Sequence, residues 1–106
     1  MNIETIPAKD IDKYIWDSGS LIVDLRSRKD YERGHISRAI NVEYDYLMER
    51  LDLLDYGKVL ILYCERGATS LMAAKELMEK GYRVKSVVGG IVSYRGNYID
   101  RGSGWL

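Results

Sequence analysis

The amino-acid sequence predicts a single α/β domain whose parallel β-sheet is covered by helices on both faces. Short apolar runs alternate along the chain with segments whose apolar residues recur at helical spacing. The main apolar runs are unbroken by polar residues, as strands that are buried on both faces require. A length of 106 residues supplies one core and no second domain. We therefore expect residues 1–106 to form one domain, with a frayed, glycine-rich tail over residues 100–106.

In the first third of the chain, turn residues separate the predicted elements. Pro7 fits the first position of a helix over residues 8–17, because its missing N–H would have no partner there in any case. The apolar run at residues 21–25 predicts a buried strand. Ser27 can then cap a short polar helix that ends at Gly34.

The middle of the chain holds the clearest elements. After a weak strand candidate at residues 39–42, the apolar spacing of residues 44–54 predicts an amphipathic helix. Residues 59–63 (VLILY) predict the central strand of the sheet. Residues 70–80 predict a strong helix, which Gly81 ends at a left-handed position.

The last third of the chain repeats the pattern. Residues 83–88 predict another strand, and a Gly-Gly pair leads into a short helix near residues 91–98. Strands that alternate with helices at this pitch imply βαβ units and therefore a parallel sheet.

Composition narrows the classes of function. Sixteen basic and sixteen acidic residues give a formal net charge of zero, so no overall field favours nucleic acid or an anionic membrane as a partner. One cysteine excludes an internal disulfide, and with only one histidine the usual four-ligand zinc site is excluded as well. We therefore expect no metal and no other cofactor.

The sequence also bears on location. No apolar stretch approaches the ~20 residues that a helix needs to cross a bilayer. The segment MNIETIPAKD lacks the basic region and the apolar core of a secretory signal. A cytoplasmic location is the resulting expectation.

Cys64 stands where the chemistry of such a fold concentrates. The strand predicted at residues 59–63 ends at this cysteine, a short loop follows, and a helix begins near Ser70. Ligands of open α/β sheets bind beyond the carboxyl ends of the strands. Gly67 lets the N–H groups of the loop turn inward, and the helix directs the positive end of its dipole to the same place. These fields favour the thiolate of Cys64, so we expect a nucleophile there.

The side chains of the other loop residues also affect the charge and the hydrogen bonding around Cys64. Arg66 adds a positive charge, which Glu65 opposes. Thr69 and Ser70 offer hydroxyls that can bond a sulfur anion or cap the helix. The alternative is that Cys64 is a small buried hydrophobe, the commonest fate of a lone cysteine. A packing cysteine needs neither a glycine-bearing loop nor a helix N-terminus beside it, which favours the reactive interpretation.

Three further residues have two interpretations each. Asp24 and Arg26 stand at the carboxyl end of another predicted strand, where they either steer an anionic substrate or form an ion pair of the scaffold. His35, the only imidazole, is either a general base or part of a structural turn. Cysteine-based transfer needs no separate base if the loop already holds a thiolate, which favours the structural role.

Three segments of the chain resemble the rhodanese family, and together they span nearly its whole length. Residues 21–42 carry the family's Asp-x-Arg strand end, an aromatic residue, a His-Ile pair and an Ala-Ile-Asn strand, here Asp24, Arg26, Tyr31, His35, Ile36, Ala39, Ile40 and Asn41. Ser37 and Arg38 replace the family's usual Pro-Gly. Residues 64–70 resemble the active-site loop, and residues 87–90 followed by Tyr94 resemble the closing Gly-Gly-aromatic signature. Each motif alone is weak, whereas their combination is specific.

The resemblance implies a three-layer rhodanese-like fold, with a five-stranded parallel sheet between helices and Cys64 as the nucleophile that forms a persulfide. It also implies that the loop amides cradle the sulfur. We assign substrate binding to this loop and to the Asp-x-Arg strand end: Glu65, Arg66, Gly67, Ala68, Thr69, Ser70, Asp24 and Arg26. Phosphatases of the family carry an arginine six residues after the cysteine. Ser70 takes that position here, which argues against a phosphatase or an arsenate reductase.

Two functions remain open. In the first, the protein is a sulfurtransferase that takes sulfane sulfur from a donor such as thiosulfate and passes it to cyanide or a thiol, and the Glu65-Arg66 pair resembles the loops of thiosulfate-using members. Because the chain has no second cysteine, an external acceptor must discharge Cys64, which makes the mechanism ping-pong. In the second, a partner protein loads the persulfide and the domain is a carrier with little activity on free thiosulfate. A shallow pocket or an apolar rim around Cys64 would favour the carrier.

Overall fold

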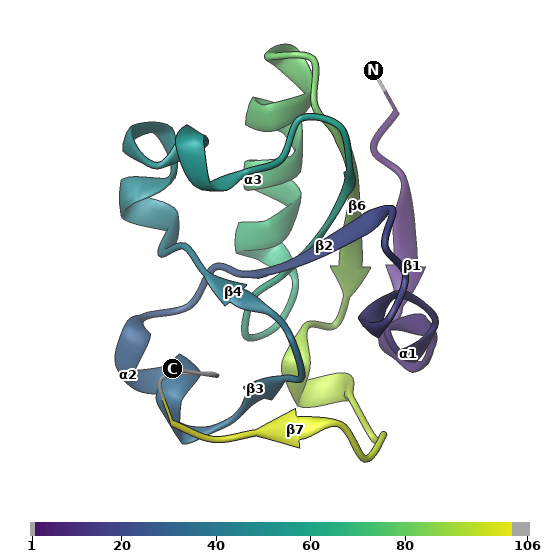
Figure 1. Ribbon diagram of the computed structural model, residues 1–106. Helices are drawn as coiled ribbons and strands as arrows, with labels where there is room; N and C mark the ends of the chain where they lie inside the picture. Colours follow the sequence, from purple (N-terminus) through teal and green to yellow (C-terminus); the bar gives the residue numbers. More distant parts are fainter. Residues whose placement is uncertain (1, 103–106) are drawn as a thin grey trace.

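The computed structural model describes residues 2–102 and holds one five-stranded sheet in the order β1-β6-β5-β2-β4 (Figure 1). In that order the strands are Thr5–Pro7, Arg83–Val88, Val59–Tyr63, Ser20–Asp24 and Ile40–Asn41. Every neighbouring pair in this sheet is parallel. The α/β class and the five-stranded parallel sheet are therefore confirmed.

Helices and a small second sheet surround these strands. The α-helices are α1 (Asp12–Ile15), α2 (Arg28–Arg33) and α3 (Ala68–Glu79), and the 3-10 helices are η1 (Ala8–Asp10), η2 (Tyr44–Glu49), η3 (Leu51–Leu53) and η4 (Ile91–Ser93). Two short strands, β3 (His35–Ile36) and β7 (Ile99–Asp100), pair in antiparallel fashion. None of the helices in residues 2–102 combines the length and apolar character that crossing a bilayer requires.

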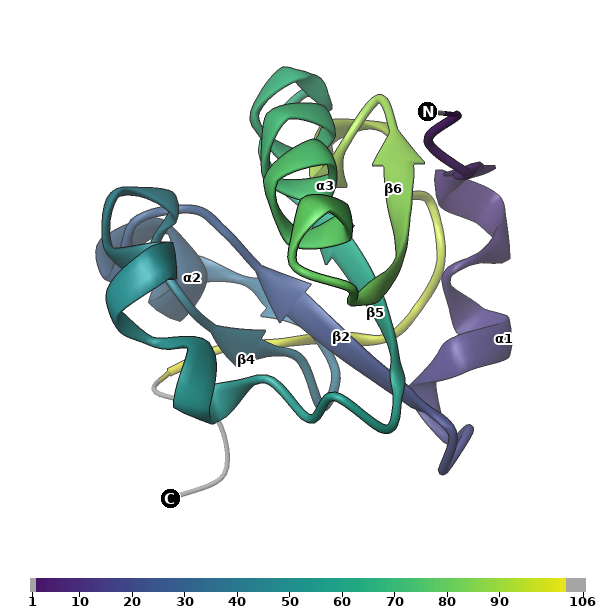
Figure 2. The same cartoon turned by 90° about the horizontal axis from the view of Figure 1, so that it is seen from above.

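Two apolar cores lie on the two faces of the main sheet. Along β5, Leu60 and Leu62 belong to the core under α3, whereas Ile61 and Tyr63 belong to the core that also holds Ile11 next to α1. Figure 2 shows α3 and α1 on opposite sides of the sheet. Successive side chains of a strand point to opposite faces, so a strand that is covered on both sides needs an unbroken apolar run.

The start of the chain differs from the prediction. Pro7 does not begin a helix but ends β1, where it pairs with Val88 in extended conformation (φ −72°, ψ 153°). An edge strand tolerates proline because one of its sides needs no partner for the N–H. The single helix predicted for residues 8–17 is instead the short turn η1 followed by α1. Asp17 lies beyond α1, and its side chain accepts from the N–H of Gly19 at 3.0 Å, which closes the turn into β2.

The amphipathic helix predicted for residues 44–54 is also wrong in type. The segment forms the two 3-10 turns η2 and η3, which Arg50 separates with a φ of −123°. Leu47 and Leu54 are the buried residues of this segment, and Tyr44 and Leu51 pack against the same core while partly exposed.

The remaining elements differ from the prediction mainly in their bounds. Helix α3 begins at Ala68, two positions before the prediction, and Gly81 follows it with a φ of 92° as expected. The last predicted helix is reduced to η4. Residues 100–102 of the predicted frayed tail are held in place, because Asp100 pairs in β7 and the N–H of Gly102 donates to the Glu32 carbonyl at 2.8 Å. Residues 103–106 of that tail lie outside the described residues.

Candidate active site

The sulfur of Cys64 lies at the carboxyl end of β5 and is surrounded by backbone N–H groups. The N–H of Gly67 donates to Sγ at 3.1 Å, and the N–H of Ser70 donates to it at 3.3 Å. Cys64 is 5% exposed, so these contacts are formed away from bulk water. Donors aimed at one sulfur stabilise negative charge on it, and the N-terminus of α3 adds its dipole at the same point.

Two glycines give the loop this shape. Gly67 has a φ of 109°, and a Cβ on it would lie 3.1 Å from the Gly89 nitrogen. Gly90 has a φ of 62°, and a Cβ on it would lie 2.3 Å from the Glu65 carbonyl oxygen. Side chains at these positions would meet both an unfavourable backbone conformation and a close neighbour. The segment after β6 therefore packs directly against the cysteine loop.

Backbone hydrogen bonds complete this contact. The N–H of Ile91 donates to the Cys64 carbonyl at 2.9 Å, and the N–H of Val92 donates to the Glu65 carbonyl at 3.2 Å. Sequence reasoning assigned no role to Ile91 and Val92. The Gly-Gly pair before them was the available signal, because it marks a close backbone approach.

Ser70 binds the sulfur through its backbone and the scaffold through its side chain. Its hydroxyl donates to the Gly67 carbonyl at 3.1 Å and lies 2.8 Å from the hydroxyl of Ser86 in β6. Both serines are buried, at 0% and 1% exposure. The expectation that the Ser70 hydroxyl can bond a sulfur anion is not what the structure shows, since this hydroxyl already has two protein partners. Ser86 was missed because its sequence context is an ordinary strand.

The remaining loop residues face outward. Glu65, Arg66 and Ala68 are exposed, and Thr69 is half-buried. Arg66 lines a hollow of about 310 Å³ together with Gly67 and Val88, on the β6 side of the loop. The structure thus brings residues 64–70 together around one sulfur, with the backbone inside and the charged side chains at the rim.

Asp24 and Arg26 form an ion pair of the scaffold. The Asp24 carboxylate is fully buried and lies 2.7 Å from Nη2 of Arg26, while the Tyr63 hydroxyl donates to it at 2.6 Å. Arg26 Nη2 also donates to the Gly34 carbonyl at 2.6 Å. Burial, and next the Asp24 charge, raise the pKa of Tyr63 well above its usual value, so this hydroxyl stays a donor. The geometry favours the scaffold interpretation over substrate steering for both residues.

His35 is likewise held within the scaffold. It is 1% exposed, its Nδ1 lies 2.8 Å from the Tyr31 carbonyl, and its ring stacks on that of Tyr31 at 3.8 Å between centroids. These contacts favour the structural role. Within residues 2–102, no group of three or more His, Cys, Asp and Glu side chains is placed to hold a metal ion.

The fold and the site together define an α/β protein whose one cysteine lies buried in a cradle of backbone N–H groups, at the carboxyl edge of a five-stranded parallel sheet. The family model that matches this chain, over residues 7–97, is described as the rhodanese-like domain. The protein therefore belongs to the rhodanese-like domain family, which confirms the resemblance seen in the sequence.

Two relatives and one solved structure are similar to this chain. The chain is 35% identical over 96 residues to a tRNA uridine(34) hydroxylase of Hamiltonella defensa, covering 84% of this chain and 27% of that protein. It is 35% identical over 94 residues to a tRNA sulfurtransferase of Desulfurococcus amylolyticus, covering 87% of this chain and 18% of that protein. The chain thus spans roughly a quarter or less of these relatives. A rhodanese-like domain protein from Staphylococcus aureus shares the fold, with a TM-score of 0.85, 20% identity and coverage of 95% of this chain and 100% of that chain.

Proposed function

We propose that the protein is a sulfurtransferase that carries sulfane sulfur as a persulfide on Cys64. The observation that carries this proposal is the pair of N–H groups, from Gly67 and Ser70, that point at Sγ. They stabilise the Cys64 thiolate before the reaction and the anionic persulfide after it. The side chain of a buried packing cysteine would need neither donor.

Thiosulfate is the donor that we propose. The Cys64 thiolate attacks the outer sulfur of thiosulfate, a new S–S bond forms, and the bond to the sulfonate sulfur breaks with release of sulfite. Three negative charges are present before and after this step, so it needs no oxidant and no proton. The exposed guanidinium of Arg66 at the rim of the loop can attract this dianion.

A phosphatase or arsenate reductase fits the site poorly. The sixth residue after the cysteine is Ser70, whose hydroxyl bonds Gly67 and Ser86 instead of facing a ligand. A bound phosphate or arsenate dianion favours a bidentate guanidinium at that place, and Ser70 cannot supply one.

The mass of the protein after incubation with thiosulfate tests the proposal. We expect a gain of about one sulfur atom, which cyanide then removes with the appearance of thiocyanate. The variant Cys64→Ser removes the soft nucleophile at little change of volume, so it should fold and gain no sulfur. Sulfur transfer that persists in Cys64→Ser would rule out this mechanism.

A carrier loaded by a partner protein is the second candidate, and apolar exposure beside the loop favours it. Val88 is 56% exposed and Leu71 is 42% exposed, and both line the hollow next to Arg66. The curated relatives are also several times longer than this chain, so there a domain like this one works beside others. A wild-type protein that gains no sulfur from thiosulfate, yet accepts it from a persulfidated protein, would identify the carrier.

The direct partners that we propose are a sulfur donor and a thiol or cyanide acceptor, with a donor or acceptor protein in the carrier case. Two relatives are named for tRNA, but the zero net charge of this chain supplies no field for a nucleic acid. No cofactor enters either candidate mechanism. The cytoplasmic location remains a prediction from the sequence.

A further inference from the structure

Ser86 is a buried polar residue that the proposed sulfur chemistry does not use. It lies in β6 and is 1% exposed. Its backbone is fixed from both sides, because β6 pairs with β1 at Thr5 and with β5 at Leu62. A hydroxyl that is removed from water needs a hydrogen-bond partner. Among residues 2–102, that partner is the hydroxyl of Ser70 at 2.8 Å.

A chain of hydrogen bonds starts at Ser86 and runs in one direction. The Ser70 hydroxyl has a single proton, which it donates to the Gly67 carbonyl at 3.1 Å. At its contact with Ser86 the Ser70 oxygen is therefore the acceptor, and the Ser86 hydroxyl is the donor. In a buried chain of this kind each hydrogen bond polarises and strengthens the next.

The chain of hydrogen bonds ends on the two residues whose N–H groups face the Cys64 sulfur. The nitrogens of Gly67 and Ser70 lie 3.1 and 3.3 Å from Sγ. The side chain of Ser70 joins these two residues through the Gly67 carbonyl, and Ser86 fixes that side chain to the sheet. The N–H of Leu71 donates to the same carbonyl at 3.2 Å, which ties it to the first turn of α3. The positions of both donors thus depend on a residue of another strand.

We propose that Ser86 is a positioning residue of the active site. Through Ser70 it holds the N–H groups of Gly67 and Ser70 in the orientation that stabilises negative charge on the sulfur. The proposal rests on the function proposed above, in which these groups stabilise first the Cys64 thiolate and then the persulfide. Fixed donors stabilise a charge only while they point at it, so a donor that loses its support contributes less.

Two substitutions separate the hydroxyl of Ser86 from its volume. Ser86→Ala removes the hydroxyl, so the oxygen of Ser70 loses its donor. Ser86→Thr keeps the hydroxyl and adds a methyl group. This methyl group has space beside it, because Ser86, Gly67 and Leu71 line the same hollow of about 310 Å³. Threonine is also well suited to a strand.

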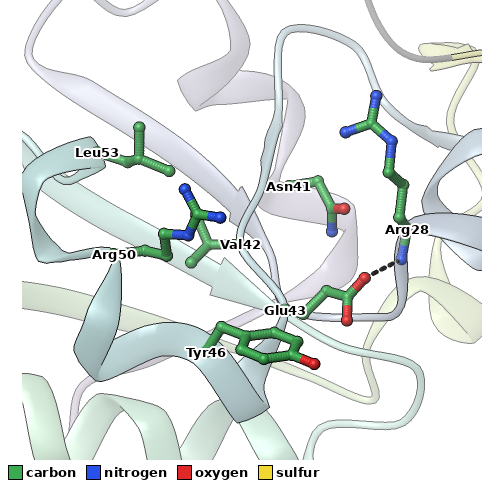
Figure 3. A pocket seen from close by; sticks show the side chains of 7 residues that line it. All are labelled: Arg28, Asn41, Val42, Glu43, Tyr46, Arg50 and Leu53. Atoms are coloured by element: carbon green, nitrogen blue, oxygen red, sulfur yellow. Dashed lines mark hydrogen bonds between the residues drawn. The ribbon is translucent and has the colours of Figure 1, made fainter.

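Asn41 supplies the control for a loss of hydrogen bonds elsewhere on the sheet. Its amide donates to the carbonyls of Asp24 and Arg26 at 3.1 and 2.9 Å. Figure 3 shows Asn41 in the wall of a pocket of about 340 Å³, which none of residues 64–70 lines. Asn41→Ala therefore removes two hydrogen bonds of the scaffold, neither of which reaches the cysteine loop.

Alkylation of Cys64 by iodoacetamide across a range of pH is the first test, and it needs no sulfur donor. The thiolate is the reacting form, so the rate follows the fraction of thiolate. We expect Ser86→Ala to shift the pH profile upward by about 0.5–1 pH unit, the effect of one hydrogen bond. Ser86→Thr and Asn41→Ala should keep the wild-type profile, and the charged loop residues Glu65 and Arg66 are present in every variant. A wild-type profile in Ser86→Ala, or an equal shift in Asn41→Ala, overturns the proposal.

Uptake of sulfur from thiosulfate, followed by mass, is the second test. At neutral pH we expect Ser86→Ala to take up sulfur about three- to tenfold more slowly than the wild type, and Ser86→Thr to restore the rate. Equally slow uptake in Ser86→Thr would mean that packing rather than the hydroxyl matters, and would overturn the proposal. If the wild type takes up no sulfur, the proposed donor is wrong, and the alkylation profiles alone decide the role of Ser86.

Discussion

Cys64 owes its surroundings to backbone atoms rather than to side chains. The donors to its sulfur are the N–H groups of Gly67 and Ser70, and its own carbonyl accepts from Ile91. Every residue except proline supplies an N–H, so the conformation of the loop, rather than the identity of its side chains, brings these donors to the sulfur. The side chains of Glu65 and Arg66 are exposed and take no part in these contacts.

The variant Gly67→Ala tests this dependence on conformation. We expect the free energy of unfolding to fall by about 1–2 kcal/mol, because alanine at a positive φ is strained, and we expect slower uptake of sulfur from thiosulfate. Urea unfolding and mass spectrometry measure the two effects. Gly19→Ala is the control, since its φ is not positive and its Cβ would make an ordinary contact of 3.5 Å. An equal loss in both variants would contradict the argument.

At the scale of elements, Asp24 joins β2, β5 and the end of α2. Its carboxylate accepts from the Tyr63 hydroxyl of β5 and pairs with Arg26, whose guanidinium also reaches the carbonyl of Gly34. Such a buried network is satisfied only while every member is present. Its place at the carboxyl edge of the sheet sets the position of the strand end next to Cys64.

We therefore expect Asp24→Asn to lower the free energy of unfolding by about 3–5 kcal/mol, because it leaves a guanidinium without its buried partner. Urea denaturation measures the loss. Asp30→Asn serves as the control, because the Asp30 side chain is 40% exposed and its ion pair with Arg33 is long, at 3.7 Å. This variant should lower the free energy of unfolding by less than about 1 kcal/mol. A small loss in Asp24→Asn would mean that the network adds little to stability.

At the scale of the whole molecule, a hydrogen bond joins residues that are 82 positions apart, Asp12 of α1 and Tyr94 just after η4. The Tyr94 hydroxyl donates to Asp12 at 2.6 Å and accepts from the N–H of Tyr98 at 3.1 Å. This contact ties the segment that holds the cysteine loop to α1. Burial, and next the hydrogen bond to Asp12, raise the pKa of Tyr94 to about 12.

This pKa predicts how stability depends on pH. In the unfolded chain Tyr94 loses its proton near pH 10, whereas the folded protein keeps it up to about pH 12. The stabilisation is therefore complete below pH 10 and is lost as the pH rises from about 10 to 12. Urea unfolding across this interval should show a falling free energy, with a shallower slope in Tyr94→Phe than in the exposed control Tyr56→Phe. Parallel slopes in the two variants would contradict the assignment.

Several elements of the fold were predictable because they depend on residue patterns that are local in the sequence. The strand at residues 59–63 follows from burial on both of its faces and occurs as predicted. The helix before Gly81 is ended by that glycine at a left-handed position, as predicted, although it begins two residues earlier. Residues 44–54 were predicted as the wrong type of helix, because apolar spacing alone does not distinguish one continuous α-helix from two 3-10 turns that bring most of the same side chains to the core. The short pairing of β3 with β7 had no local signal, since strands of two residues show no periodicity.

The sequence by itself determined the α/β class, the family and the cysteine at the end of the central strand, because these depend on spacing along the chain. Only the tertiary structure decided which groups face Sγ, that the Ser70 hydroxyl lies next to that of Ser86, and that Asp24 and Arg26 pair with each other. The physical reason is that parallel strands bring residues distant in sequence to one edge, and this proximity leaves no trace in local composition.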